Sequence, residues 1–437
     1  MKKILILGNS YAGAKCAQEI RLADSESEII IFCTDAALPF HSHLFVDFLS
    51  KKIEEKDVYF ENENYYQQKR IQLIANKTIS RINLKKNILA TDDKEQISFD
   101  ILVIADAPAI RFPEMKGTQK AGVFSLERWT DVKNMAAVLP VTETVAIDVD
   151  TPKGLTVACR LKERKKDVIV LTGKEYILSQ LIEKEPAELI TQALEKNDIR
   201  VARNNDINEI LGNGDVKAIR LESGKVLAAQ VVILGRIKPD WRLVADSGLA
   251  IKQGLMVNEF LRTNLDHVYA MGKACEFADS KQGEESPLAD QEAQAKVLSA
   301  NISGQPAAYQ PSLRSYALKI GDLEIDILGQ TKSHEGCKVL SQSDGDSQSY
   351  KSILIKNDRA IGVVLINTQE EKDKYLRLIE DRVDVSSLGG RLLNPCSYAE
   401  ILEMIPDRPA TEEHPADPQG MSSSLDQLPD GENIQIN

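Results

Sequence analysis

The sequence lacks closely spaced cysteines. The six that it has stand far apart, without a C-x-x-C pair or a zinc-type spacing, at Cys16, Cys33, Cys159, Cys275, Cys337 and Cys396. We therefore predict no metal site and no adjacent redox pair. Most of these cysteines are expected to be small buried apolar residues.

An apolar run long enough to cross a membrane is also absent. Residues 1–7 are similar to the start of a signal peptide, but Asn9 and Ser10 interrupt the apolar stretch and no cleavage site follows. We interpret the segment as a first buried strand. The cytoplasm is therefore the expected location, and no membrane span is predicted.

There is no excess of basic residues. Lys and Arg number 54 against 66 Asp and Glu, a net charge of −12, so non-specific attraction to nucleic acid or anionic membranes is not expected. Apolar residues make up 43% and charged residues 27%, which is ordinary for a soluble globular protein. A chain of 437 residues is too long for one compact core, so two or three domains are expected.

What the sequence does contain is a βαβ pattern that occurs twice. The first unit has an apolar run at residues 3–7, a turn with glycines at residues 8–13, a helical stretch at residues 14–22 and a β-rich run at residues 28–32. The second unit has an apolar run at residues 144–147, a helical stretch at residues 154–162 and a β-rich run at residues 167–171. Two such units predict two nucleotide-type α/β domains built on parallel sheets.

Two further segments follow these units. Residues 312–405 alternate between strand-like runs and include one helical stretch, which predicts a separate α+β domain. Residues 406–437 hold five of the sixteen prolines and seven acidic residues against one basic residue. Such a composition cannot bury enough surface to fold alone, so we predict an acidic, proline-rich tail, disordered or docked on a partner.

The turn of the first unit is the clearest candidate site. It reads Gly8-Asn9-Ser10-Tyr11-Ala12-Gly13 between a strand and a helix, which is where dinucleotide-binding domains hold a pyrophosphate. Gly8 allows a tight turn, Ser10 is small enough for a phosphate to approach, and Gly13 lets the helix pack closely on the strand. The helix N-terminus offers free N–H groups. A purely structural turn is the alternative interpretation.

The acid that normally holds the ribose is missing from the end of the second strand. Cys33 stands there, and Asp35 follows two residues later. Asp35 either substitutes for the missing acid or is a solvated loop residue.

Several later segments match the motifs of one family, in the same order. Residues 99–105 (FDILVIA) are similar to its YDxLxIATG strand, residues 122–126 (GVFSL) to GVFxLR, and residues 254–272 to GIxVDxxLRTxxxxIYAxGD. Residues 288–300 are similar to its closing helix. On these motifs the chain resembles the FAD/NAD(P)-dependent pyridine nucleotide-disulfide oxidoreductases. Within that superfamily it resembles NADH:rubredoxin reductases and the flavin portion of NADH-dependent nitrite reductase.

The resemblance implies an α/β fold with two Rossmann-like dinucleotide-binding domains of the glutathione-reductase kind, a C-terminal α+β domain and the acidic tail. It assigns residues 1–112 and 256–305 to an FAD-binding domain and residues 113–255 to an NAD(P)-binding-like domain. Residues 312–405 form the C-terminal domain, and residues 406–437 the tail. FAD is the expected cofactor. The residues assigned to its site are Gly8, Ser10, Tyr11, Ala12, Gly13, Asp35, Lys52, Ala105, Gly272, Lys273 and Ala289.

The second turn departs from the family pattern. With Gly154 as its third glycine, the first two glycine positions hold Val149 and Thr151, while Asp148 and Asp150 place carboxylates beside the phosphate cradle. NAD(P) is therefore not an expected cofactor, unless a short insertion has shifted the alignment.

Two flavin-side positions are changed as well. Asp106 and Ala107 stand where the family has Thr-Gly, and Lys273 replaces the acid that bonds the ribityl chain. Lys273 either reaches the pyrophosphate as a point charge, fills the site, or faces Asp106 as a compensating partner.

No catalytic residue is assigned from the sequence. His41 and His43 lie in a loop without cysteine and are either flavin-edge groups or solvated residues. The leading hypothesis is an FAD-binding oxidoreductase or electron-transfer subunit that works with a protein redox partner. The alternatives are a non-catalytic scaffold that has lost its nucleotides and an ordinary NADH-dependent reductase. A homodimer is compatible with each.

Overall fold

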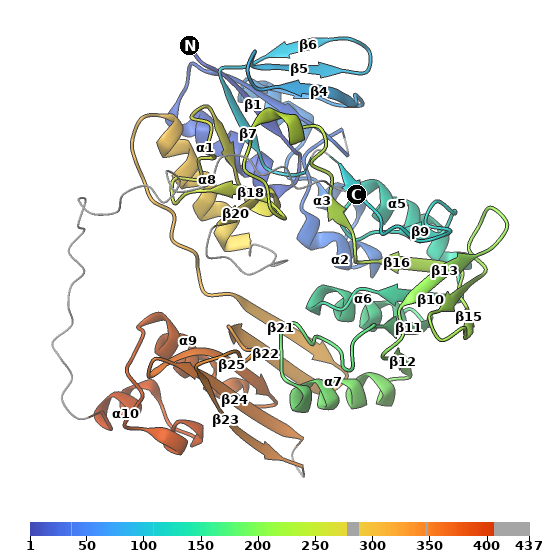
Figure 1. Cartoon of the computed structure of the whole chain (residues 1–437), viewed down its shortest axis with the longest axis vertical. Helices are drawn as coiled ribbons and strands as arrows, with labels where there is room; N and C mark the ends of the chain where they lie inside the picture. Colours follow the sequence, from blue (N-terminus) through green and yellow to red (C-terminus); the bar gives the residue numbers. More distant parts are fainter. Residues whose placement is uncertain (36, 108, 278–287, 346–347, 406–437) are drawn as a thin grey trace.

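The computed structural model describes residues 1–35, 37–107, 109–277, 288–345 and 348–405, and Figure 1 labels the elements of that part. Three five-stranded sheets dominate it, two of them parallel and one antiparallel. Among the described residues, every helix is too short or too polar to cross a membrane. The predicted acidic tail, residues 406–437, lies outside the described residues.

The first parallel sheet has the strand order β19-β7-β1-β2-β3. Its strands are β1 (Lys3–Leu7), β2 (Glu28–Phe32), β3 (Ile71–Ile74), β7 (Ile101–Ile104) and β19 (Val268–Ala270). The inner strands β1, β2 and β7 are almost wholly apolar and buried, as expected of strands covered on both faces, whereas the edge strand β3 exposes Gln72. Helix α1 (Tyr11–Ala23) packs beside α8 (Leu288–Ile302), where the Ser299 hydroxyl donates to the Glu19 carbonyl at 2.9 Å.

The second parallel sheet repeats this arrangement with the order β12-β11-β10-β16-β9. Its strands are β9 (Val123–Phe124), β10 (Thr144–Asp148), β11 (Asp167–Leu171), β12 (Ile199–Ala202) and β16 (Val231–Leu234). Helices α6 (Pro152–Glu163) and α7 (Lys184–Lys196) join its central strands to their neighbours. The two βαβ units predicted from the sequence are therefore confirmed.

Backbone contacts align the two units residue by residue. A Cβ added to Gly13 would lie 2.1 Å from the carbonyl oxygen of Gly8, and one added to Gly154 would lie 2.1 Å from that of Val149. The neighbouring strands agree, because Leu7 pairs with Ile104 and Asp148 pairs with Leu234. Gly154 is thus the counterpart of Gly13, and no shifted alignment is needed in the second turn.

Each unit also carries a three-stranded antiparallel sheet that the sequence did not predict. The first consists of β4 (Ile79–Asn83), β5 (Ile88–Thr91) and β6 (Gln96–Ser98), and the second of β13 (Ile207–Leu211), β14 (Ala218–Leu221) and β15 (Val226–Ala228). The remaining elements before residue 305 are short: η1 (Ser42–Leu44), α2 (Phe45–Leu49), α3 (Glu55–Val58), α4 (Glu63–Gln68), β8 (Ile110–Arg111), α5 (Trp129–Val138), η2 (Leu139–Val141), β17 (Lys238–Pro239), η3 (Ala245–Ser247), β18 (Leu255–Val257), η4 (Gly272–Ala274) and β20 (Cys275–Phe277).

The C-terminal part is an antiparallel sheet with order β21-β22-β25-β24-β23. Its strands are β21 (Ser315–Ile320), β22 (Leu323–Gly329), β23 (Cys337–Asp344), β24 (Ser349–Lys356) and β25 (Arg359–Ile366), and its helices are η5 (Gln369–Glu371), α9 (Lys372–Glu380), η6 (Gly389–Leu393) and α10 (Tyr398–Glu403). In Figure 1 it lies against the second unit, with β21 beside α7. This confirms the predicted α+β domain.

Polar contacts join this sheet to the second unit. Glu183, which precedes α7, accepts hydrogen bonds from Lys332 Nζ at 2.9 Å and from the Ser333 backbone N–H at 2.8 Å. The Thr331 hydroxyl donates to the Leu181 carbonyl at 2.6 Å. Apolar side chains of β21 and β22 share one core with α6 and α7 beside these bonds.

The predicted α/β class with two Rossmann-like units and a C-terminal α+β unit is confirmed. The domain boundaries at residues 112, 255 and 305 stay a prediction. Sheet membership supports them, because β19 joins the first sheet after the whole second sheet has been passed along the chain.

Candidate functional site

The turn at residues 8–13 has the backbone that a phosphate cradle needs. Gly8 has φ +110°, a conformation that favours glycine, and Gly13 lies where any side chain would meet the Gly8 carbonyl. Ser10 is the N-cap of α1 but makes no side-chain cap bond. The first turn of α1 contains no acidic side chain to satisfy its N–H groups.

The carboxylate of Asp106 lies in this turn. Its Oδ2 accepts a hydrogen bond from the Ser10 backbone N–H at 3.1 Å, and its Oδ1 accepts one from the Ser10 hydroxyl at 2.8 Å. Burial raises the pKa of Asp106, while the bonds from Ser10 and the charge of Lys273 act in the opposite direction. A carboxyl group of the protein itself therefore occupies the N-terminus of α1.

Three small residues hold the neighbouring segment close to α1. Gly272 has φ +61°, and a Cβ added to it would lie 2.9 Å from the Cβ of Ala12 and 3.1 Å from the Ala105 carbonyl oxygen. Its N–H donates to Gln294 Oε1 of α8 at 2.7 Å. The predicted site residues Ala12, Ala105 and Gly272 are thus brought together with Gly8 and Gly13.

Lys273 belongs to an ion network that joins the two units. Its ammonium donates to Glu127, and Lys153, at the start of α6, lies 3.5 Å from the other oxygen of the same carboxylate. Burial opposes ionisation of Glu127, but the two lysines outweigh it and lower its pKa to about 2. Lys273 thus has a partner other than Asp106, although its charge also acts on Asp106.

Glu127 was missed in the sequence. It occupies the last position of the motif GVFxLR, where the family pattern has arginine, while Lys273 occupies the last position of the motif that ends in Gly-Asp. Two opposite charge reversals at these positions are the signal that could have revealed the pair.

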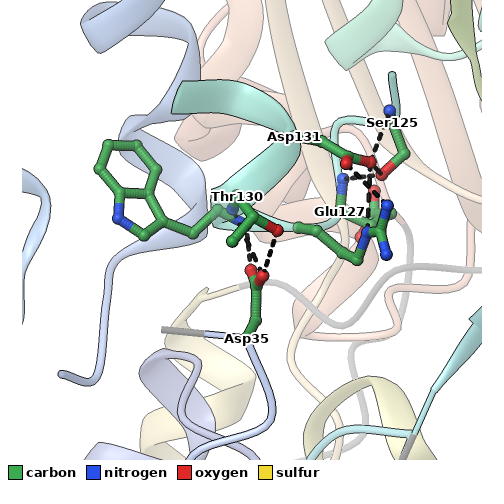
Figure 2. A network of polar contacts seen from close by, with 7 residues as sticks. Asp35, Ser125, Glu127, Thr130 and Asp131 are labelled. Atoms are coloured by element: carbon green, nitrogen blue, oxygen red, sulfur yellow. Dashed lines mark hydrogen bonds and ion pairs between the residues drawn. The ribbon is translucent and has the colours of Figure 1, made fainter. Parts of the chain in front are cut away.

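Asp35 binds the N-terminus of α5 (Figure 2). Its carboxylate accepts hydrogen bonds from the Trp129 backbone N–H, from the Thr130 backbone N–H at 3.3 Å and from the Thr130 hydroxyl at 2.6 Å. Burial raises the pKa of Asp35, and these bonds oppose the rise. Asp35 is therefore a helix-capping residue rather than a solvated loop acid.

Asp131, in the first turn of α5, is a buried acid. It accepts hydrogen bonds from the Ser125 backbone N–H at 3.0 Å, from the Ser125 hydroxyl at 2.7 Å and from Arg128. Together with Asp35 it fixes the path of residues 125–131, and with it the position of Glu127.

A small cavity of about 170 Å³ opens at the carboxyl ends of β2 and β3. It is lined by Cys33, Thr34, Asp35, Asn76, Lys77 and Thr78. Ligands of open α/β sheets bind at this end of the strands. The cavity lies next to the first turn, because β2 pairs with β1.

Tyr11 belongs to a cluster of aromatic and imidazole rings. The His41 ring lies 5.2 Å from the Tyr11 ring, 5.0 Å from the His43 ring and 5.3 Å from the Phe60 ring, measured between centroids. Burial, with a smaller contribution from His43, lowers the pKa of His41 to about 4. His41 is thus neutral near pH 7 and is not a solvated loop residue.

Of the two remaining predicted site residues, Lys52 lies apart from these contacts and the side chain of Ala289 is not described. Lys52 is exposed in the turn after α2 and makes no side-chain contact with the first turn in the described part of the chain. Ala289 is the second residue of α8, and its side chain lies outside the described residues.

The N-terminus of α6 in the second turn has few free donors. Pro152 at its first turn has no N–H to donate, and the Thr151 hydroxyl accepts the N–H of Gly154 at 3.2 Å. Asp150 accepts the Leu178 N–H at 2.5 Å and the Thr172 hydroxyl at 3.0 Å, which holds the loop after β11 against the turn. Fewer donors face the position of a pyrophosphate here than in the first turn.

Asp148, at the end of β10, is buried and bonded to Arg236. Arg236 Nε donates to Asp148 Oδ2 at 3.0 Å, and Nη1 donates to Asp206 Oδ2 at 2.7 Å. Burial raises the pKa of Asp148 to about 6, although Arg236 opposes the rise.

No group of three or more potential metal-binding side chains occurs among the described residues.

Comparison with known proteins agrees with the geometry. Residues 2–295 match the model of the family "Pyridine nucleotide-disulphide oxidoreductase", and residues 315–383 match the "Rubredoxin NAD+ reductase C-terminal domain". The structure superposes on a putidaredoxin reductase–putidaredoxin complex with a TM-score of 0.80 at 18% identity, covering 92% of this chain and 98% of that one.

Two curated relatives from Bacillus subtilis (strain 168) are longer than this chain. Nitrite reductase [NAD(P)H] is 25% identical over 91% of this chain and 49% of its own length. The assimilatory nitrate reductase electron transfer subunit is 24% identical over 93% of this chain and 52% of its own length. The chain therefore spans about half the length of these relatives.

Proposed function

The chain belongs to the pyridine nucleotide-disulphide oxidoreductase family, a family of FAD-binding oxidoreductases, and on that premise we propose that it is a flavin-dependent electron-transfer protein working with a protein redox partner. FAD, when bound, supplies the redox chemistry, and the protein holds and orients it. The names of the relatives, a nitrite reductase and an electron transfer subunit, support this class of activity.

The observation that carries the proposal is the first turn. Its positive-φ glycine, its close contact between Gly8 and Gly13, and the long helix α1 behind them fit a pyrophosphate. The proposed FAD-binding residues remain those predicted: Gly8, Ser10, Tyr11, Ala12, Gly13, Asp35, Lys52, Ala105, Gly272, Lys273 and Ala289. The cavity at the ends of β2 and β3 is the proposed adenosine pocket.

The second turn is proposed not to hold NAD(P) in the usual way. Pro152 and Thr151 remove two donors that a pyrophosphate would use, and Asp150 adds a carboxylate beside them. Electrons would then arrive from a protein donor rather than from NADH. Because the name of one relative includes NAD(P)H, this point is the first to be tested.

A second function, a scaffold without nucleotides, is favoured by one observation. The Asp106 carboxylate bonds the Ser10 N–H, which would otherwise face a phosphate. If the cofactor has been lost, the fold would serve as an interaction subunit of a larger complex.

The absorbance spectrum of freshly purified native protein separates these functions. We expect the bands of oxidised flavin, about one FAD released per chain on denaturation, and no bleaching when NADH is added without oxygen. Bleaching by NADH would contradict the proposal for the second turn alone. A protein without flavin that stays colourless after incubation with excess FAD would leave the scaffold function.

A further inference from the structure

We propose that Asp106 is an internal competitor for the phosphate-binding end of α1, so that this side chain sets the affinity of the chain for FAD. The inference rests on the proposed function, since it concerns the same site. It goes beyond that function by assigning control of cofactor loading to one residue of the protein.

The first argument is the hydrogen bonding. Asp106 uses both carboxylate oxygens on Ser10, one on its backbone N–H and one on its hydroxyl. Those are the two donors that the middle position of the turn offers to a phosphate oxygen. A phosphate can bond them only after Asp106 has left.

The second argument is space. The Cβ that Gly8 lacks would lie 2.4 Å from Asp106 Oδ2 and 2.7 Å from Asp106 Cβ. Asp106 therefore fills the volume that the glycine leaves open over the turn. A phosphate group entering along this backbone would collide with the carboxylate as well as repel it.

The third argument is the charge of the surroundings. Lys273 attracts the Asp106 carboxylate, and Glu127, which is bound to Lys273, repels it. The carboxylate stays in place through its bonds to Ser10, supported by a lysine that already has a second anionic partner. Removal of the Asp106 charge would leave the field of Lys273 and of the α1 N-terminus to the incoming diphosphate.

The second unit shows that an acid is not required by the fold at this position. Asp106 lies two residues beyond Ile104, the partner of Leu7, and Arg236 lies two residues beyond Leu234, the partner of Asp148. The equivalent side chains thus carry opposite charges. The acid in the first unit is a property of this site and not of the strand end in general.

The test is an FAD titration of the full-length chain after any bound flavin has been removed, followed by the quenching of flavin fluorescence. The variants are Asp106→Asn, which removes the charge, and Asp106→Thr, which also shortens the side chain. The control is Asp100→Asn, which removes a charge just before β7, at the opposite end of the strand, where Asp100 accepts the Lys3 N–H. Circular dichroism and thermal melting verify that each variant is folded.

We expect both Asp106 variants to bind FAD about tenfold or more tightly than the natural chain, and Asp100→Asn to bind it equally well. Binding by the two Asp106 variants alone would support the inference and would leave the natural chain with the scaffold function. If the natural chain binds FAD and the folded Asp106 variants bind it no better, the inference is overturned and the proposed function stands. If none of the four proteins binds FAD, the proposed function is overturned and the inference falls with it.

Discussion

At the scale of single residues, Gly8 carries two constraints at once. Its positive φ is costly for any other residue, and a Cβ there would collide with Asp106. Gly8→Ala is therefore expected to lower the free energy of unfolding by about 2–4 kcal/mol, the sum of backbone strain and overpacking.

The matched control for this prediction is Gly224→Ala. Gly224 also has a positive φ, +83°, but nothing lies within 4 Å of an added Cβ. It should cost only about 1–2 kcal/mol, the strain alone. Urea denaturation of both variants measures the difference. Equal decreases in the free energy of unfolding would show that the clash with Asp106 does not contribute.

Asp148 predicts a dependence of stability on pH. Burial raises its pKa from 3.8 to about 6, so the folded state binds its proton more tightly than the unfolded state does. The proton on Asp148 therefore stabilises the folded state by about 3 kcal/mol below about pH 4, and this contribution is lost as the pH rises through 6.

The measurement is the free energy of unfolding of the natural chain minus that of Asp148→Asn, between pH 4 and 7.5. This difference should fall with rising pH. Asp167→Asn, which removes an exposed acid at the start of β11, provides the comparison. Parallel curves for the natural chain and Asp148→Asn would refute the assignment.

The residues of the site could be predicted only in part. Gly8 and Gly13 follow from a local pattern of strand, turn and helix, because their backbone requirements are set within a few residues. Asp106 and Lys273 stood out as departures from a motif. The bond between Asp106 and Ser10, and the role of Glu127, depend on strands and loops that are distant in the sequence, so no local pattern encodes them.

At the scale of elements, the start of α5 depends on a residue from another segment. Asp35 caps it through Trp129 and Thr130. Asp35→Ala should lower the free energy of unfolding by about 1–2 kcal/mol and speed amide exchange at these two residues, because the N–H groups lose their acceptor.

Asp35→Asn is the conservative comparison, since an amide oxygen still caps a helix well. It should keep most of the stability. If Asp35→Ala changes FAD affinity and leaves stability and amide exchange unaltered, the side chain serves the ribose rather than the helix. Hydrogen exchange and denaturation together decide between the two roles.

Strands that consist of a continuous apolar run were predictable from the sequence. The runs at residues 3–7, 28–32 and 167–171 predict β1, β2 and β11 to the residue, because each has four consecutive buried apolar residues after one charged residue. The antiparallel strands β4–β6 and β13–β15 were missed. They are short and half exposed, so their polar residues hide the alternation from which a strand is recognised.

At the scale of the whole molecule, Glu183 links the C-terminal sheet to the second unit. It binds Lys332 and Ser333 together, in a region where both charges are only about one-third exposed. Glu183→Gln should lower the melting temperature by a few degrees and increase proteolysis between residues 305 and 315, because docking of the sheet is weakened.

The control is Glu175→Gln in the neighbouring pair with Lys184, whose side chains are 62% and 57% exposed. An exposed pair contributes little, so this variant should melt with the natural chain. A double-mutant cycle of Glu183 with Lys332 should give a coupling of about 1 kcal/mol or more. A coupling near zero would mean that the shared apolar core alone holds the two parts together.

The order of strands in the first sheet has a consequence for biosynthesis. β19 pairs with β7, and α8 packs on α1, yet both emerge from the ribosome after the entire second sheet. Until then β7 presents an unpaired edge to the cytosol or to whatever compartment receives the nascent chain. The inserted unit can fold early, whereas the amino-terminal unit must wait with its edge open. A translational pause or a truncation before residue 268 would therefore leave a half-built sheet that is prone to mispairing and is a natural client for chaperones.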